Sequence, residues 1–552
     1  MSSFRAKLEK NSRKFQARKQ IRNREWEELF ELKSKSIYLL KLQFAGIEFS
    51  RCYFLRYASN RAIKQYFCAM RLFIPLALIA LNLIIKGLFL GLNSLAADEP
   101  FSVYHAQMSI SAIIRLLAEG NNPPLYEILL HFWIKLFGIS EFSVRFPSLI
   151  FSGVTVFFIY QIGRKFLTNH VAILASVIFI FSNYQIELTH EARVYALLGM
   201  LTAAAMFYYM DILQRCIRNP NHKIPLLTII KLAIINAMLG YAHYFGLLVI
   251  LIQLLFTLLH FSIFRYQIKR LILAYCITAI LYLPNIPTLI HRFSASSNGT
   301  WIPQIHGFDS LYYMLMKFAN APMVVVCILV IWTLALIFHF AQKTKNANLF
   351  DRFVTFWFCT IFLGMFLISF KTPIFFGRYL MPAAIAFPLL VAMSCSLVLS
   401  NKKTNQIISG LMALLFIVTA DLASPTQIKI RQCVDTLKSL KAPNTVVYIC
   451  PDWLDLNFVY YYNRQYFKDF NDRDIKKNIV QNLKAENIYP IKNGNQIPKK
   501  SFIKGGKILY LDDAAEFNYP NNKVKQILDQ HCSLQRSYRF KNHFVIYEYE
   551  VK

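Results

Sequence analysis

Two adjacent acids, Asp98 and Glu99, directly follow the first long apolar stretch of the chain. A carboxylate at the end of a membrane span can take a proton from a hydroxyl group or hold a cation, whereas one inside the hydrocarbon must be neutralised or paired. The two acids could also do no more than stabilise a surface helix by facing the positive end of its dipole. The pair is therefore a candidate for proton transfer, with a helix cap as the alternative.

Other residues that could bind a ligand stand at the ends of apolar stretches or just inside them: Lys86, His190, Glu191, Arg193, Tyr195, His243, Tyr244, Arg378 and Tyr379. An arginine can bind a phosphate through two hydrogen bonds, so Arg378 is a candidate phosphate ligand, which Lys86 could assist. Both cations could instead extend towards lipid headgroups. Glu191 and Arg193 could contact a substrate or form an interfacial ion pair, and His243 could bind a substrate or hydrogen-bond within a helix bundle.

No pattern in the sequence specifies a metal or another cofactor. The chain has neither a His-Glu-x-x-His motif nor paired Cys and His residues at zinc-site spacing, so no metal ligands are predicted. One carboxylate pair can help to hold a divalent cation but cannot specify it, which leaves a divalent cation as an open alternative. Several of the 10 cysteines lie within apolar stretches, and no disulfide framework is predicted.

The composition places these residues in a membrane protein. Of 552 residues, 56% are hydrophobic, and the mean hydropathy is +0.37, which is too apolar for an ordinary soluble protein. The formal charge of +31 would suit a nucleic-acid partner. We predict no nucleic-acid binding, because the basic residues fall in short connections and in the N-terminal segment, where they set topology or contact anionic lipid.

Eleven stretches have the length and composition of membrane spans. They lie near residues 72–92, 146–164, 170–186, 194–212, 226–241, 245–264, 269–286, 319–340, 352–370, 378–400 and 405–421. With the N-terminus in the cytoplasm, the basic connections fall on the cytoplasmic side, in agreement with the positive-inside rule. The acids, histidines and arginines of the candidate site then share the external face.

The segments outside these spans predict three parts. Residues 1–71 form a basic cytoplasmic segment, and residues 72–421 form the membrane domain, whose first external loop, 93–145, carries surface helices over 101–119 and 124–137. After residue 421 the composition changes to alternating, β-prone runs such as 445–449 and 507–511, which predict a small α+β domain over 422–552. Because the number of predicted spans is odd, this domain lies on the external side when the N-terminus is in the cytoplasm. The predicted fold is thus a polytopic α-helical membrane protein with a small extracytoplasmic C-terminal domain.

The ordered motifs of the chain resemble the GT-C superfamily of membrane glycosyltransferases, in the branch of the protein O-mannosyltransferases and the lipid A aminoarabinose transferase. The motifs are Ala97-Asp98-Glu99, Asn122-Pro123-Pro124-Leu125-Tyr126, Arg145-Phe146-Pro147-Ser148, Glu191-Ala192-Arg193-Val194-Tyr195 and His243-Tyr244-Phe245. The match is strong over 97–197 and thin after 246, apart from Arg378-Tyr379. Family members commonly have His where this chain has Asn122, so no role of that imidazole can be transferred.

The resemblance implies an inverting hexosyl- or pentosyltransferase. It would move a sugar from a polyprenyl-phosphate donor to an extracytoplasmic protein, lipid or glycan, as an integral protein of a bacterial inner membrane with a periplasmic active site. Asp98, or alternatively Glu99, would be the base, and the donor phosphate would meet Lys86, Arg193, Arg378 and Tyr379. The substrate pocket would be lined by Tyr126, His190, Glu191, Tyr195, His243 and Tyr244.

Two other classes of function remain as alternatives. A transporter or flippase for lipid-linked glycans would place polar groups near the bilayer midplane and break helices there, whereas this chain concentrates them in external loops. A glycan ligase or polymerase of another fold would have its large loop late in the bundle, whereas here the long loop comes first.

Overall fold

The computed structural model describes residues 61–95, 98–120, 122–297, 302–305, 307–341, 348–399, 401–423, 429–468, 477–540 and 544–552. The chain forms two compact units, Met1–Ile74 and Pro75–Lys552. Of the predicted basic segment 1–71, all but the beginning of helix α3 (Arg61–Gly87) lies outside the described residues. The residues of the candidate site all belong to the larger unit.

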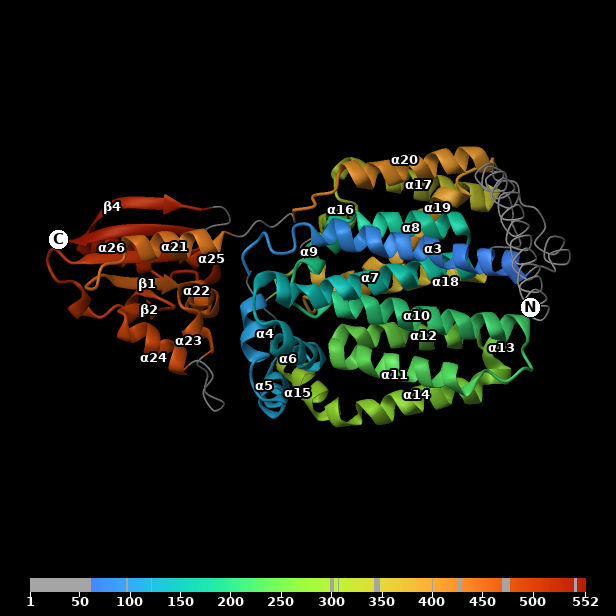
Figure 1. Ribbon diagram of the computed structural model, residues 1–552, viewed down its shortest axis with the longest axis horizontal. Coiled ribbons are helices and arrows are strands. Elements are labelled where there is room, and N and C mark those ends of the chain that lie inside the picture. Colours follow the sequence, from blue (N-terminus) through green and yellow to red (C-terminus); the bar gives the residue numbers. More distant parts are fainter. Residues whose placement is uncertain are drawn as a thin grey trace, which may run out of the picture. The chain divides into compact units, whose positions relative to one another are not determined.

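Apolar helices of different lengths make up most of the larger unit, since a helix satisfies its own backbone hydrogen bonds in hydrocarbon. After α3 and the external loop they are α7 (Glu141–Phe166), α8 (Asn169–Ile180), α9 (Asn183–Thr189), α10 (Tyr195–Arg218), α11 (Leu226–Ala242), α12 (Leu247–Leu259), α13 (Phe261–Phe264), α14 (Ile268–Tyr282), α15 (Ile286–Ser297), α16 (Asp309–Phe318), α17 (Pro322–Ala341), α18 (Leu349–Ile368), α19 (Met381–Leu397) and α20 (Lys402–Val418). Figure 1 shows the long helices packed side by side as a bundle.

The number of spans differs from the prediction. By length and composition, 5 helical segments of the described chain could cross a membrane, or up to 7 if each of two bent pairs counts as one span. The pairs are α8 with α9, bent by 59°, and α16 with the first part of α17, bent by 101°. The chain is therefore a polytopic helical protein, but the predicted eleven spans are not confirmed. The runs predicted over 226–241 and 245–264, for example, form shorter apolar helices.

Helices α7 and α8 meet closely where the chain turns between them. A Cβ added to Gly163 of α7 would lie 2.4 Å from the Cα of Ala172 in α8, which is closer than such atoms can approach. Small residues of this kind let membrane helices pack backbone against backbone. Because α7 also packs against α10 and against the external loop, this contact helps to fix the scaffold of the site.

The first external loop contains three short helices, α4 (Glu99–His105), α5 (Ile110–Glu119) and α6 (Leu125–Phe137), which lie together at one end of the bundle (Figure 1). The prediction of one helix over 101–119 is wrong, because this stretch belongs to two helices, α4 and α5. Ser109 accepts a hydrogen bond from the backbone of Ala112 and so begins a second helix after a turn. Pro124 stands at the N-cap of α6, where its fixed backbone angle is favourable.

The C-terminal part is a mixed sheet covered by helices. Its strands are β1 (Val446–Cys450), β2 (Ile488–Pro490), β3 (Lys507–Asp513), β4 (Cys532–Arg539) and β5 (Phe544–Val551), in the order β2-β1-β3-β5-β4. β1 pairs in parallel with β2 and β3, whereas β5 pairs antiparallel with β3 and β4. The helices include α21 (Ile430–Leu440), α22 (Asp455–Tyr462), α23 (Arg464–Lys468), α24 (Lys477–Ala485), α25 (Ala515–Asn518) and α26 (Val524–His531).

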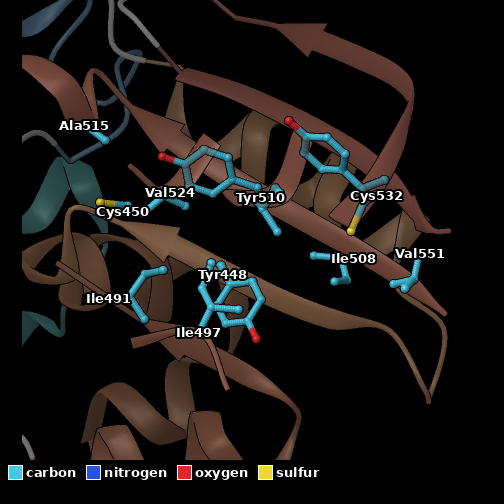
Figure 2. Packing of buried hydrophobic residues seen from close by; sticks show 12 residues of the cluster. Tyr448, Cys450, Ile491, Ile497, Ile508, Tyr510, Ala515, Val524, Cys532 and Val551 are labelled. Carbon is cyan, nitrogen blue, oxygen red and sulfur yellow. The ribbon is translucent and has the colours of Figure 1, made fainter. Parts of the chain in front are cut away.

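The core of this sheet explains why the β-prone runs form its central strands. The runs 445–449 and 507–511 fall on β1 and β3, whose side chains are buried except at strand ends. Figure 2 shows Tyr448, Ile508 and Tyr510 from these strands packed in one hydrophobic cluster. Burial on both faces favours such continuous apolar strands.

Candidate functional site

Asp98 stands at the N-cap of α4 with its carboxylate between two arginines. Its Oδ2 accepts a hydrogen bond of 2.8 Å from Nη1 of Arg378, and Nη2 of Arg193 lies 3.8 Å away. The side chain is 51% exposed and makes no capping hydrogen bond to the backbone of α4. Asp98 thus stands at the positive end of α4 without a side-chain capping hydrogen bond, and it presents an accessible carboxylate beside two cations.

The arginines set the protonation state of Asp98. Partial burial by itself would raise the pKa of this carboxyl group, but the charges of Arg193 and Arg378 and the hydrogen bond from Arg378 outweigh it. The pKa of Asp98 thus lies below its ordinary value, and the group is ionised at neutral pH. An ionised, accessible carboxylate can accept a proton from a hydroxyl group placed against it.

Glu99 is buried, although it directly follows the half-exposed Asp98 in the chain. Its two oxygens accept hydrogen bonds of 2.8 and 2.7 Å from Arg145, and Oε1 also accepts one of 2.7 Å from the backbone of Ala192. Both side chains of the ion pair are 2% exposed. A buried, bidentate pair of this kind holds elements together, and it leaves Glu99 little access to a substrate.

Arg145 extends this buried contact to the segment before the acids. Its remaining N–H groups donate to the carbonyl oxygens of Leu90, Asn93 and Ser94 at 2.8 to 3.0 Å. The guanidinium of Arg145, near the start of α7, therefore binds the segment between α3 and α4 as well as the first residue of α4. The sequence signal for this role is an arginine near the beginning of an apolar span, where an unpaired charge would be costly.

Ser102 links Arg193 to a second acid, Glu127. Nη1 of Arg193 donates to Ser102 Oγ at 2.7 Å, and Ser102 Oγ donates to Oε1 of Glu127 at 2.9 Å. Burial raises the pKa of Glu127, with the charge of Arg193 and the bond from Ser102 opposing it. The sequence motifs did not point to Ser102 or Glu127, and the available signal for Glu127 was an acid in the first turn of the largely apolar α6. Neighbouring Tyr126 is also buried, and burial raises its pKa.

Glu191 and His190 lie on the loop that carries Arg193. Oε2 of Glu191 is shielded from solvent without a hydrogen-bond partner in the described part of the chain. Burial raises the pKa of Glu191 to about 7. The charge of Arg378 lowers this pKa, and the charge of Glu99 raises it further. His190 turns inward instead, since its Nε2 lies 2.7 Å from the carbonyl oxygen of Lys86, and burial lowers its pKa to about 4.

Aromatic residues form a wall beside Arg378. Its guanidinium lies 5.5 Å from the ring of Tyr195, whose centroid is 6.1 Å from that of His243. The ring of Tyr379 is 5.4 Å from His243. Buried His243 accepts a hydrogen bond from the backbone of Phe245 and has its pKa lowered to about 3 by burial and by the charge of Arg193. Four predicted residues are thus brought together on one side of Asp98.

Two further predicted residues have other neighbours. Lys86 is fully buried in α3, where Nζ donates to Ser152 Oγ at 3.0 Å and lies 4.3 Å from the ring centroid of Phe179. Neither contact joins it to Asp98 or to the two arginines. Tyr244 faces the charge of Arg292 in α15. Within the described ranges, no group of three or more His, Cys, Asp or Glu residues could hold a metal ion.

The C-terminal sheet domain contacts the segment that leads to Asp98. Tyr461 Oη of α22 accepts a hydrogen bond of 2.7 Å from the backbone of Leu95, and Tyr460 Oη donates one of 2.6 Å to the carbonyl oxygen of Ile139. Arg431 of α21 forms an ion pair with Glu141 at the start of α7. The site is therefore bounded by residues that are distant in the sequence.

The chain is similar to known proteins over part of its sequence and over most of its fold. Residues 121–291 match the family model of the dolichyl-phosphate-mannose-protein mannosyltransferases. No curated protein matches the chain. Among solved structures, ArnT from Cupriavidus metallidurans in the apo state has a TM-score of 0.53 at 11% identity, with 87% of this chain and 98% of that chain covered.

The same protein bound to undecaprenyl phosphate gives a TM-score of 0.52 at 10% identity, covering 86% of this chain and 97% of that chain. An oligosaccharyltransferase from Archaeoglobus fulgidus tethered with an acceptor peptide gives 0.48 at 10% identity, covering 87% and 74%. The likeness to ArnT shows a shared fold that spans nearly the whole of both chains.

Proposed function

We propose that the chain is a membrane glycosyltransferase of the GT-C superfamily and that it transfers one sugar from a polyprenyl-phosphate donor to a hydroxyl group of an extracytoplasmic acceptor. The acceptor would be a protein, a lipid or a glycan. The observation that carries the proposal is the accessible, ionised carboxylate of Asp98 between Arg193 and Arg378. It combines a base for a hydroxyl group with cations for a phosphate.

The proposed reaction is a single displacement. The acceptor oxygen attacks the anomeric carbon from the face opposite the phosphate, so the configuration inverts. As the new C–O bond forms, the bond from the anomeric carbon to the phosphate oxygen breaks, and the acceptor proton passes to Asp98. The phosphate leaves with the bonding electron pair, and Arg378 and Arg193 stabilise its charge.

The ion pair between Asp98 and Arg378 suggests that the donor binds before Asp98 accepts the proton. In the free enzyme the arginines lower the pKa of Asp98 and so weaken it as a base. A donor phosphate that takes hydrogen bonds from these guanidinium groups would compete with Asp98 for them. Donor binding would thus restore basicity to the carboxylate at the moment when a proton has to be accepted.

The positive-inside pattern supports a position of this site on the extracytoplasmic face of the membrane, and we propose the inner membrane of a bacterium with lipid molecules around the bundle. Glu191, Tyr195, His243 and Tyr379 would line the sugar pocket or the entry of the phosphate. On this proposal Glu99 is a structural residue, and Asp98 is the base.

The test is sugar transfer by purified protein in lipid nanodiscs. Undecaprenyl-phosphate-linked sugars are offered one by one with an acceptor extract from cells that lack the protein, and transfer is followed by mass spectrometry. We expect at least one sugar to be transferred, and Asp98→Asn to reduce the rate by about 100-fold or more, as expected for a general base. Asp421→Asn, at an exposed aspartate after α20, should keep the wild-type rate.

The two parts of the proposal fail separately. Wild-type transfer by Asp98→Asn would overturn the assignment of the base. Absence of transfer from every lipid-linked donor by the folded wild-type protein would overturn the function itself.

A further inference from the structure

Helix α16 places a lysine next to Arg378. Lys317, in the last turn of α16, runs across Gly377: a Cβ added to that glycine would lie 3.3 Å from Lys317 Nζ and 3.5 Å from its Cδ. Gly377 directly precedes Arg378 at the start of the 3-10 turn η4 (Gly377–Leu380). The ammonium group thus lies beside the backbone that carries the arginine bound to Asp98.

The backbone under Lys317 is fixed from a second helix. Tyr184 of α9 donates a hydrogen bond of 2.8 Å to the carbonyl oxygen of Gly377, and its ring packs edge-on against Phe318 at 5.0 Å. Figure 1 shows α9 and α16 at the end of the bundle where α4 also lies. Three segments that are distant in the sequence therefore hold Lys317 at this position.

The charge of Lys317 acts on a neighbouring carboxyl group, that of Glu187, but no direct ion pair in the described part of the chain holds it. Its side chain is exposed, and its ammonium makes no hydrogen bond or ion pair with the residues that the structure describes. The charges of Lys317 and Arg378 both act on the carboxyl group of Glu187, so the two cations share one electrostatic neighbourhood. Arg378 and Arg193, in contrast, are already bonded to Asp98 and Ser102.

The chemistry of the leaving group requires more positive charge late in the reaction than early. A sugar linked through a phosphodiester carries one negative charge on its phosphate. The lipid phosphate that leaves is a monoester, with a second pKa of about 6, and approaches two negative charges at neutral pH. A cation that makes no direct hydrogen bond in the resting protein can therefore contribute more to the departing phosphate than to the bound donor.

We propose that Lys317 binds the phosphate of the lipid carrier together with Arg378 and acts mainly on the charge that develops as the sugar leaves. This inference rests on the proposed function and assigns a further residue to the same reaction. A lysine that only extends towards lipid headgroups would show no preference for the dianionic phosphate.

Binding of undecaprenyl phosphate to the full-length protein in detergent tests the inference without knowledge of the sugar. Four proteins are compared: wild type, Lys317→Gln, Lys317→Arg and Lys371→Gln, the last at an exposed lysine between α18 and η4. At pH 8 we expect Lys317→Gln to weaken binding about tenfold, as is typical for loss of one charge-assisted contact. Lys317→Arg should restore most of the affinity, and Lys371→Gln should leave it unchanged.

The pH dependence separates a phosphate contact from a structural effect. The difference between wild type and Lys317→Gln should shrink from pH 8 to pH 5, because the lipid phosphate loses its second charge near pH 6. Equal binding by wild type and Lys317→Gln at pH 8, or an equal loss in Lys371→Gln, would overturn the role of Lys317 alone. A wild-type protein that neither binds this lipid nor transfers sugar would overturn the proposed function as well.

Discussion

At the scale of single residues, the carboxylate of Asp98 is half exposed beside two arginines, while both oxygens of Glu99 are held by Arg145. The two side chains diverge because successive residues at the start of a helix point about 100° apart. The same local sequence therefore supplies an accessible acid and a buried one. This difference predicts separate consequences for their removal.

Replacing Glu99 with Gln should destabilise the protein, because it leaves the guanidinium of Arg145 buried without a counter-charge. Breaking one partner of a buried ion pair typically costs about 3–5 kcal/mol. Asp98→Asn, at an exposed position, should change the unfolding temperature little. Thermal unfolding in detergent compares the two, and a wild-type unfolding temperature for Glu99→Gln would contradict the structural role of the pair.

The sequence could not separate the two acids, although it pointed to their position. Hydropathy and the motifs place Asp98, Glu191, Arg193 and Arg378 near span ends, and residues 121–291 match a mannosyltransferase family model, in agreement with the resemblance. The direction of each side chain depends on tertiary partners that hydropathy does not encode. Lys317 was missed for the same reason, since no motif surrounds it.

At the scale of elements, apolar composition predicts that helices form but does not fix how far each one extends across a membrane. Helices α8 and α16 each end at a bend, so a segment that could count as one span consists of two helices. Span number is therefore the part of the fold that hydropathy predicts least well. Close contacts between helices, such as that at Gly163, depend on single small residues.

Gly163→Ala should destabilise the bundle, because its Cβ would overlap the backbone of Ala172 and force α7 and α8 apart. Overpacking of this kind typically costs about 1–3 kcal/mol. Gly364→Ala in α18 is the matched control, since a Cβ there would meet no atom within 4 Å. A lower unfolding temperature is expected for the first variant only, and equal temperatures for both would contradict the tight contact.

At the scale of the whole molecule, the C-terminal sheet domain and the membrane helices meet at the segment before Asp98. Tyr461 binds the backbone of Leu95, while Arg431 binds Glu141 in the helix that carries Arg145. The domain therefore contacts both the loop of the proposed base and the helix that anchors this loop. We propose that it positions the loop for catalysis.

Tyr461→Phe should lower kcat several-fold with little change in the donor KM, because the lost hydrogen bond loosens the loop of Asp98 without touching the phosphate ligands. Tyr489→Phe, on β2 of the same domain, is the control and should behave as wild type. The readout is steady-state transfer once the donor is known. A change in KM alone, or none at all, would mean that the domain does not position the loop.

The spacing of the two ion pairs along the chain has a consequence for biosynthesis. Arg145 follows Glu99 by 46 residues, whereas Arg378 follows Asp98 by 280. A nascent chain can therefore close its structural pair soon after the second long helix is made, but the partner of Asp98 emerges only towards the end of translation. The buried ion pair can thus form during translation well before the ion pair at the candidate site.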